Sequence, residues 1–422
     1  MNGYARFTVR MSRGVIESVV RTSPITPHAV THAAAAAADG DGGADSTADA
    51  DAAAAAEAGD AAAGAGDRDV HVIDGTNKML LPGMVNAYTH SIEAWGRGGI
   101  VPLPLELWVN SLFTHMDPRG PNPSISPDVV YWAALHTAVE TILTGGTAVM
   151  DHLLQSRSRY PDGGCVKLLK DIGWLSLPGT SCAHCVWLED DEQAIMAECG
   201  AVAVHNPVSN LRLGSGVAPI RAYLDKGITV AIGCDGQCSN DSQDMLEAMK
   251  MACIVNPLTT PEYRHWLSPR EVLKMAAEGG AAAVGMRGQA GQIKPGYMAD
   301  AVLVDLTALS MLPRADPVGQ LVLTRQSSGI AGNTVHSVWV NGRLLLSDGV
   351  PTTVDLAPLR EALMKQQPQY MDPKITDVKG RPIEVEYRAA MGLDAPLGKH
   401  NQSHTSNYPN FRVNYPADIP KS

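Results

Sequence analysis

The stretch LLPGMVNAYTHSIEAWGRGG (residues 80–99) has a spacing of residue types that could serve metal chemistry. Residues two apart on a β-strand point to the same face, so a His-x-His pair at a strand end directs two imidazoles at one ion. In this chain the pair is Tyr88 and His90. A phenol must lose a proton from a pKa of about 10 before it can ligate a metal. The pattern therefore predicts a metal-binding strand end that Tyr88 weakens.

More side chains that could do chemistry follow short apolar segments further along the chain. They are Asp151, His152, His184, His205, Asn206 and Asp235. A (β/α)8 barrel carries its functional groups at the C-terminal ends of parallel strands, which is the placement seen here. An open Rossmann-like sheet shares that placement, but no Gly-rich dinucleotide fingerprint follows any of these segments.

The elements that would position these groups follow a pattern that occurs four times. In each case an amphipathic helical segment ends at glycine and is followed directly by an apolar strand. The four segments are SPDVVYWAALHTAVETILTGG into TAVMDH, GGCVKLLKDIG into WLSLPGTSCAHC, EDDEQAIMAECG into AVAVHNPVSN, and APIRAYLDKG into ITVAIGCDG. Ser126 suits the N-cap of the first helix and Pro127 its first position. The alternation predicts βα units and a parallel sheet, with strands near residues 84, 148, 183, 204 and 231.

The flanks of this region predict a second, antiparallel sheet built from both ends of the chain. RFTVRMSRGVIESVV and DVHVIDGTNKMLLPG precede it, with Asp74-Gly75 as an expected turn. AVLVDL and VHSVWVNGRLLLSDG follow it, with Asn341-Gly342 as a hairpin turn. We expect a composite β-sandwich from 1–32 and 67–82 with 286–350, and a barrel over 83–285. Residues 33–66, rich in Ala, Asp and Gly, predict a disordered insertion, and 351–422 a loosely ordered extension.

Composition limits the classes of function. Hydrophobic residues make up 45% and charged residues 18% of the chain, which is typical of a folded globular protein. Seven acids between residues 33 and 66 supply most of the net charge of −11. No basic cluster indicates nucleic-acid binding, and no apolar run reaches the roughly 18 residues of a membrane span. Seven scattered cysteines and an N-terminus without an apolar signal segment favour the cytoplasm.

Several blocks of sequence resemble the amidohydrolase superfamily, in the branch of aminohydrolases and chlorohydrolases that act on amino-substituted nitrogen heterocycles. They are LLPGMVNAYTH, LPLELWV, GGTAVMDH, AHCVWLEDDE, VAVHNPVSNLRLGSGVAPIRAYLDKGITVAIGCDGQCSNDSQDM and GQIKPGYMADAVLVDL. The resemblance runs through most of residues 67–350 and is most specific over 201–245. It implies an α/β fold: a metal-dependent (β/α)8 barrel with a small β-sandwich from the two chain ends.

The resemblance also implies site residues and a cofactor. In the family, one divalent ion, zinc or iron, lowers the pKa of a bound water so that hydroxide forms near neutral pH. By position, His90 and Asp235 match metal ligands, and His184 matches the catalytic histidine that polarises the site. Asn206 and Asn210 match the loop that faces a small heterocyclic substrate, and Trp187 is a candidate substrate platform.

Two departures from the family pattern point the other way. Tyr88 stands in place of the first ligand, and only thirty residues (153–182) separate the DH strand from the AHC strand. In the family, that interval holds the third histidine ligand and the acid/base glutamate. A closed barrel needs eight strands at roughly thirty residues per βα unit, so the barrel is expected to be incomplete by about three units. Catalytic zinc usually takes three protein ligands, and two match here.

Other residues offer alternatives. Cys182 and His184, two apart, could both face the interior and supply substitute zinc ligands, although buried cysteine is more often a small core residue. Asp151-His152 fits a structural pair at a strand end better than a site pair. His205 could either orient the HNPVSN loop or reach the pocket, and His136 fits helix packing.

The sequence thus leaves two function classes open. The first is a hydrolase of non-peptide carbon–nitrogen bonds that deaminates or dechlorinates a heterocycle, in which case the gene product would contain the absent strands. The second is a catalytically inactive scaffold that forms a homo-oligomer or pairs with an intact paralogue. A product that does not fold is the third possibility. Metal content separates the first two.

Overall fold

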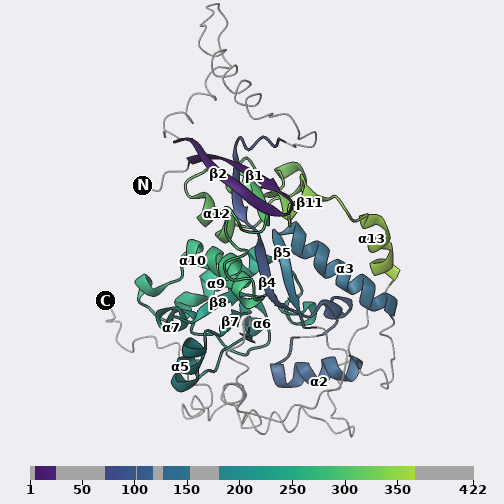
Figure 1. The fold of residues 1–422 in the computed structure, drawn as a ribbon. Coiled ribbons are helices and arrows are strands. Elements are labelled where there is room, and N and C mark those ends of the chain that lie inside the picture. Colours follow the sequence, from purple (N-terminus) through teal and green to yellow (C-terminus); the bar gives the residue numbers. More distant parts are fainter. Residues whose placement is uncertain (1–4, 25–71, 101, 117–126, 153–179, 366–422) are drawn as a thin grey trace, which may run out of the picture. The chain divides into compact units, whose positions relative to one another are not determined.

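The computed structural model describes residues 5–24, 72–100, 102–116, 127–152 and 180–365 (Figure 1). The chain divides into two compact units, Met1–Val9 with Val19–Thr76, and Arg10–Ser18 with Asn77–Ser422. The predicted disordered insertion at 33–66 and the end of the predicted C-terminal extension lie outside the described residues. All of the candidate site residues belong to the second unit.

Parallel strands form the centre of the second unit. Strand β4 (Met84–Thr89) pairs in parallel with β5 (Gly146–Asp151). Strands β6 (Ser181–Ala183), β7 (Val202–His205) and β8 (Thr229–Ile232) form a second parallel sheet. All five predicted strands are therefore confirmed.

The two parallel sheets meet where β4 lies beside β8. The backbone N–H of Asp235, just after β8, donates to the carbonyl of Tyr88 at 2.8 Å, and the amide oxygen of Asn86 accepts from the N–H of Cys234 at 2.9 Å. In the described part of the chain the strand order is thus β5, β4, β8, β7, β6. The C-terminal ends of these strands share one edge, where their following residues meet.

Helices cover the outside of these strands because each has an apolar side to bury. The residues that follow β4 form η2 (Ser91–Gly96). Helix α5 (Asp190–Cys199) has a Glu189–Glu192 capping box and ends at Gly200 with φ +69°, as its glycine predicted. The other helices are α2 (Leu105–Met116), α3 (Pro127–Leu143), α6 (Pro207–Arg212), α7 (Ile220–Asp225), α8 (Gln237–Asn240), α9 (Met245–Val255), α10 (Pro269–Lys274), the π-helix η6 (Met275–Gly279), α11 (Gly280–Ala283), α12 (Pro317–Leu323) and α13 (Leu356–Lys365).

An antiparallel sheet joins segments from before and after the parallel strands. Strand β3 (Lys78–Pro82) pairs with β9 (Ala301–Asp305), and the sheet continues through β10 (Val335–Val340), β11 (Arg343–Ser347) and β12 (Val350–Pro351). The predicted Asn341-Gly342 turn is present, with φ of +50° and +75°. Strands β1 (Ala5–Ser12) and β2 (Val15–Pro24) form a separate two-stranded sheet.

Two expectations about the flanks were wrong. The turn before β3 lies at Thr76-Asn77, not at Asp74-Gly75, because the Asp74 carboxylate accepts from the N–H of Thr76 at 2.8 Å and Asn77 takes the left-handed φ of +56°. The start of the C-terminal extension is also ordered, since α13 packs beside α3. Its one buried side chain is Leu359, which anchors an otherwise exposed helix.

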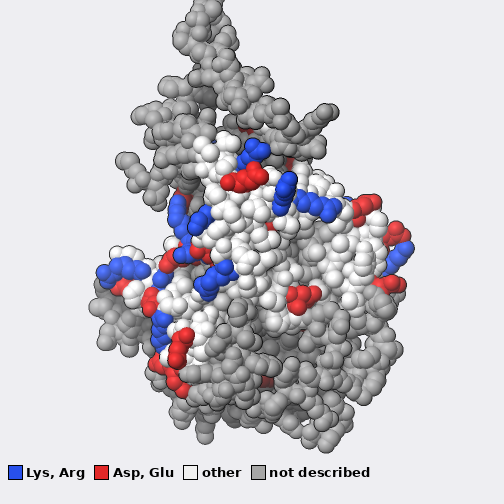
Figure 2. Space-filling model, viewed as in Figure 1, with Lys and Arg blue, Asp and Glu red and all other residues white. Residues whose placement is uncertain are grey.

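The apolar core lies between the parallel strands and their helices. Its largest fully buried side chains include Tyr223, Ile232, Met249 and Leu321. No helix in the described ranges is both long enough and apolar enough to cross a membrane. On the face shown in Figure 2, Lys and Arg side chains are interspersed with Asp and Glu. Ion pairs among the described residues include Arg270 with Asp316 at 2.9 Å.

Candidate active site at the strand ends

Five polar side chains converge at the C-terminal ends of the parallel strands. Tyr88 and His90 belong to or follow β4, His152 follows β5, His184 follows β6 and Asp235 follows β8. The Tyr88 ring centroid lies 5.0 Å from that of His90, 4.5 Å from that of His152 and 5.3 Å from that of His184. We call these five residues the strand-end cluster. The structure thus brings together His90, His184 and Asp235, as predicted.

The Asp235 side chain lies between two imidazoles of the strand-end cluster. Its Oδ2 accepts from the Ser209 hydroxyl at 2.6 Å, and its Oδ1 accepts from the Gly236 N–H at 2.8 Å. The Nε2 atoms of His90 and His184 each lie 3.7 Å from one of its two carboxylate oxygens. The Asp235 side chain is buried, and its two carboxylate oxygens lie between the two imidazoles.

The backbone at two cluster residues is left-handed. His184 has φ +67° and Asp235 has φ +64°, values that residues other than glycine seldom adopt. Each residue lies just beyond a strand, where the turn redirects its side chain. Backbone strain of this kind concentrates at functional sites, because the surrounding structure must hold it in place.

The imidazole of His90 has a defined tautomer. Its Nδ1 lies 2.7 Å from the carbonyl oxygen of His152, which can only accept, so Nδ1 carries the proton. In the neutral ring Nε2 is then an acceptor, and the Tyr88 hydroxyl, 3.0 Å away, donates to it. Burial, and then the negative charges of Asp235 and Glu93, raise the pKa of Tyr88. Its phenol therefore remains protonated at neutral pH.

The predicted substrate-facing amides are buried beside His184. The Asn210 Oδ1 accepts from His184 Nδ1 at 2.7 Å, which directs His184 Nε2 toward Asp235. Among the described residues, both amide atoms of Asn206 and the Nδ2 of Asn210 have no hydrogen-bond partner. An unsatisfied buried polar group costs about 1–3 kcal/mol, so these atoms are candidates for contact with a ligand or water.

A buried polar network that the sequence did not indicate holds β4 against the loop after β8. The Gln243 Oε1 accepts from Asn86 Nδ2 at 2.9 Å and from the Thr89 hydroxyl at 2.8 Å. The Gln243 Nε2 donates to the backbone carbonyl of Asp235 at 2.6 Å. Gln243 was missed because a glutamine between two helices carries no spacing signal.

Glu93 is a second residue that the sequence reasoning missed. It is 2% exposed, and burial, followed by the charge of Asp235, raises its pKa well above the ordinary value. Its Oε2 accepts from the Cys238 N–H at 3.3 Å. A Cβ added to Gly236 would lie only 1.8 Å from this oxygen, so Glu93 packs directly against the glycine. The available signal was an acid in an apolar run, three residues after His90.

The alternatives raised by the sequence are resolved in different ways. Asp151 is structural, as expected, because it accepts from the N–H and hydroxyl of Ser91 at 3.0 and 2.5 Å. His152 also makes strand-end contacts, since its N–H donates to the Thr89 carbonyl at 2.8 Å. Its ring, however, lies in the strand-end cluster, which is the other alternative that the sequence left open. His152 joins the cluster because its ring packs on the Tyr88 ring.

Cys182 and His184 do not share a face. Cys182 pairs in register with Ala203, and both pack into the apolar core on the helix side of the sheet. His184 reaches the opposite side only because its left-handed φ ends the strand alternation. Trp187, 42% exposed, lies beside Gly216, and its role as a substrate platform stays a prediction.

The strand-end cluster offers few of the ligands that a metal ion would need. In the ranges that the structure describes, no group of three or more His, Cys, Asp and Glu side chains is placed to hold one ion. His90 and Asp235 are the two predicted ligands present, and Tyr88 stands at the position of the first ligand. Because catalytic zinc usually takes three protein ligands, the described residues do not fit that ion.

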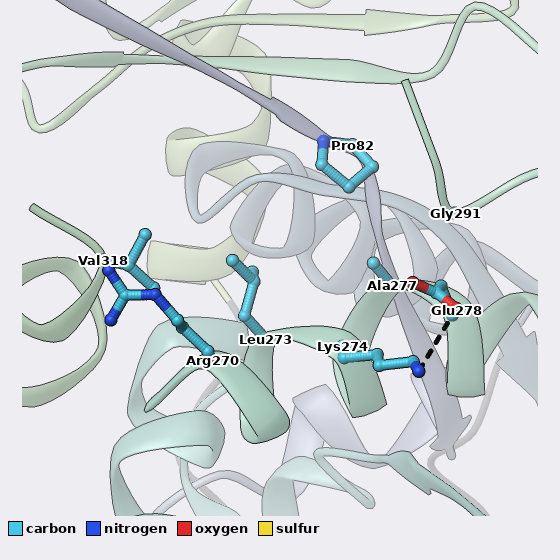
Figure 3. A pocket seen from close by; sticks show the side chains of 8 residues that line it. All are labelled: Pro82, Arg270, Leu273, Lys274, Ala277, Glu278, Gly291 and Val318. Carbon is cyan, nitrogen blue, oxygen red and sulfur yellow. Dashed lines mark ion pairs between the residues drawn. The ribbon is translucent and has the colours of Figure 1, made fainter. Parts of the chain in front are cut away.

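A small surface cavity lies elsewhere in the second unit (Figure 3). Its volume is about 180 Å³, and its lining includes Pro82 at the end of β3, Arg270 and Lys274 of α10, and Val318 of α12. Lys274 is paired with Glu278 at 3.9 Å, and none of the lining residues belongs to the strand-end cluster.

His205 gives a test of the site's electrostatics. The side chain is 2% exposed, and burial, followed by the nearby His184, lowers its pKa to about 3. Between pH 3 and the unfolded pKa of about 6.5 the unfolded chain binds the extra proton, so the free energy of unfolding falls as pH falls. The loss is up to about 1.4 kcal/mol per pH unit, and the contribution is complete above pH 6.5.

His205→Gln should therefore flatten the decline of the unfolding free energy across this pH window, measured by urea unfolding at pH 4, 5, 6 and 7. His265→Gln, at an exposed position, should retain the wild-type slope. Equal slopes in wild type and H205Q would show that His205 is not buried in the neutral form.

Comparison with known proteins supports the assignment suggested by these features. The model of the amidohydrolase family matches residues 159–345. The 5-methylthioadenosine/S-adenosylhomocysteine deaminase of Syntrophomonas wolfei is 26% identical over 398 aligned positions, which take in 70% of this chain and 88% of that enzyme. The 5'-deoxyadenosine deaminase of Methanosarcina barkeri is 36% identical over 214 positions, and this chain spans only 47% of its length.

Solved structures share the fold. The adenosine deaminase of Xanthomonas campestris with bound zinc matches with a TM-score of 0.63 at 21% identity, covering 85% of this chain and 92% of the other. The zinc complex of the atrazine chlorohydrolase of Arthrobacter aurescens TC1 matches with a TM-score of 0.64 at 19% identity, covering 85% and 94%. The mixed α/β fold is thus of the amidohydrolase barrel type, and residues 159–345 are similar in sequence to the amidohydrolase family.

Proposed function

We propose that this chain hydrolyses an exocyclic carbon–nitrogen bond of an amino-substituted nitrogen heterocycle, with a 5'-substituted adenosine as the first substrate to test. The names of the related deaminases support the substrate class. The carrying observation is the position of Asp235 between the Nε2 atoms of His90 and His184, 3.7 Å from each. Dechlorination of a triazine is the related reaction suggested by the chlorohydrolase.

The described residues can divide the work of such a hydrolysis. The Asp235 carboxylate accepts a proton from the attacking water, while His184 faces the developing charge on the ring. The water oxygen bonds to the ring carbon, the carbon–nitrogen bond breaks, and ammonia leaves with the transferred proton. The unpaired amide atoms of Asn206 and Asn210 can bind the ring's polar edge.

A divalent ion, zinc or iron, would supply a water of lowered pKa in this reaction. Within the described ranges no three His, Cys, Asp or Glu side chains are placed to hold such an ion together, so no step above depends on it.

An incomplete barrel is the other part of the proposal. The 398 positions aligned with the Syntrophomonas deaminase take in 70% of this chain, so about a hundred of them have no counterpart here. That length equals about three βα units. Among the described residues, β5 and β6 each have one edge without a paired strand, and they bound the same interval. Both observations support a missing segment between β5 and β6.

The second candidate function is heterocycle binding without hydrolysis, in a scaffold that pairs with an intact paralogue or with itself. The hydrogen bond from the Tyr88 hydroxyl to His90 Nε2 favours it, because it occupies a nitrogen that catalysis by metal would need.

Turnover and binding measured together separate the two candidates. The full chain is incubated with 5'-deoxyadenosine, 5-methylthioadenosine and atrazine, with and without added zinc, and ammonia or chloride release is followed. Isothermal titration measures binding in parallel. We expect binding and release of ammonia with an adenosine-type compound. Binding without release would support the scaffold, and the absence of both would contradict both candidates.

A further inference from the structure

We propose that Tyr88 takes the place of a metal ion in the strand-end cluster, with its hydroxyl donating to the imidazole nitrogen that a metal would bind. The cluster is then a hydrogen-bonded assembly that is complete without an ion. This inference concerns the metal content of the chain and does not depend on the proposed hydrolysis.

The first support is the way His90 is oriented. A metal-ligating histidine commonly donates its other ring N–H to a carboxylate or a backbone carbonyl, which directs the free lone pair at the ion. His90 has this arrangement, since Nδ1 donates to the His152 carbonyl at 2.7 Å. The ring is thus oriented as a ligand would be, with Nε2 facing the interior of the cluster.

The second support is what Nε2 meets. The Tyr88 hydroxyl is 3.0 Å from it, and the tautomer makes the phenol the donor. One sp² nitrogen has one lone pair, so a hydrogen bond and a metal bond there exclude each other. Binding an ion would require the phenol to move away from a contact that it already satisfies.

The third support is that Tyr88 has little room to move. Its ring is enclosed by the imidazoles of His90, His152 and His184, and its backbone carbonyl accepts from the Asp235 N–H at 2.8 Å. A Cβ on Gly233 would lie only 3.0 Å from the Tyr88 Cβ, which shows how closely β4 and the end of β8 approach. Well-packed sites resist such displacements.

The Asp235 carboxylate fits the same picture. Each of its oxygens already accepts one hydrogen bond, from Ser209 and from the Gly236 N–H. Both oxygens keep further lone pairs, so the aspartate could still ligate if a second imidazole replaced the phenol. Position 88 therefore decides whether the cluster holds an ion.

Zinc affinity of two variants tests this directly. The full chain is stripped with chelator, and zinc binding is measured by competition with a chromophoric chelator. We expect the wild type to have no zinc site that involves His90, so its zinc affinity should equal that of His90→Gln. Tyr88→His supplies a third ligand beside His90 and Asp235 and should raise zinc affinity at least tenfold. Cobalt(II) should then give visible absorption bands in Y88H only.

Tyr88→Phe is the matched control, because it keeps the ring and its packing but removes the hydroxyl. It should fold like the wild type and gain little zinc affinity, while the ¹⁵N resonance of His90 Nε2 should shift on loss of its donor. One tightly held zinc per wild-type chain that H90Q removes would overturn the proposal. So would an unchanged His90 resonance in Y88F, whatever the folding of Y88H.

Discussion

Asp235→Asn should lower kcat/KM for the proposed hydrolysis about a thousandfold, because loss of a positioned general base typically costs 10²–10⁴ in rate. The amide cannot accept the proton of the attacking water, and it removes the negative charge between His90 and His184. Steady-state ammonia release with the best adenosine-type substrate measures the effect.

The substitution adds no backbone strain. Asparagine tolerates the left-handed φ of +64° at this position about as well as aspartate does, so the turn after β8 should persist. Asp348→Asn is the control, since Asp348 is an exposed aspartate with φ +50° in the turn after β11. D348N should keep wild-type turnover. Retention of wild-type turnover by D235N would remove Asp235 from the reaction.

Gly279→Ala should destabilise the fold by about 2–3 kcal/mol, the upper part of the roughly 1–3 kcal/mol range for forcing an extra carbon into a packed interior. Gly279 ends the π-helix η6, which packs on β8, and its added Cβ would stand 1.9 Å from the carbonyl oxygen of Val230. Alanine favours a helix over glycine by about 1 kcal/mol, so the clash must outweigh that gain. The obstacle is backbone, which cannot rotate away as a side chain would.

Urea unfolding of wild type and G279A gives the difference. Gly75→Ala is the matched control, because Gly75 has open space around its would-be Cβ and no positive φ. G75A should remain within about 0.5 kcal/mol of the wild type, as most surface substitutions do. A G279A variant as stable as the wild type would mean that η6 does not lie this close to β8.

The sequence by itself determined the strands and the resemblance to the amidohydrolases. Short apolar runs identified all five parallel strands, four of them after helical segments that end at glycine, since hydrophobic periodicity and capping act over a few residues. The same local signals located the hairpin at Asn341-Gly342. They also placed His90, His184 and Asp235 after strands, which is why these residues could be expected to meet.

Only the tertiary structure decided how these groups face one another. The Cys182–His184 pairing failed because a left-handed residue breaks the two-residue alternation, and no local pattern announces it. His152, Glu93 and Gln243 joined the site through contacts with residues far away in the chain. The hydrogen bond of Tyr88 also depends on the tertiary structure. The sequence showed that residue 88 is not a histidine, and the fold placed the Tyr88 hydroxyl 3.0 Å from His90 Nε2.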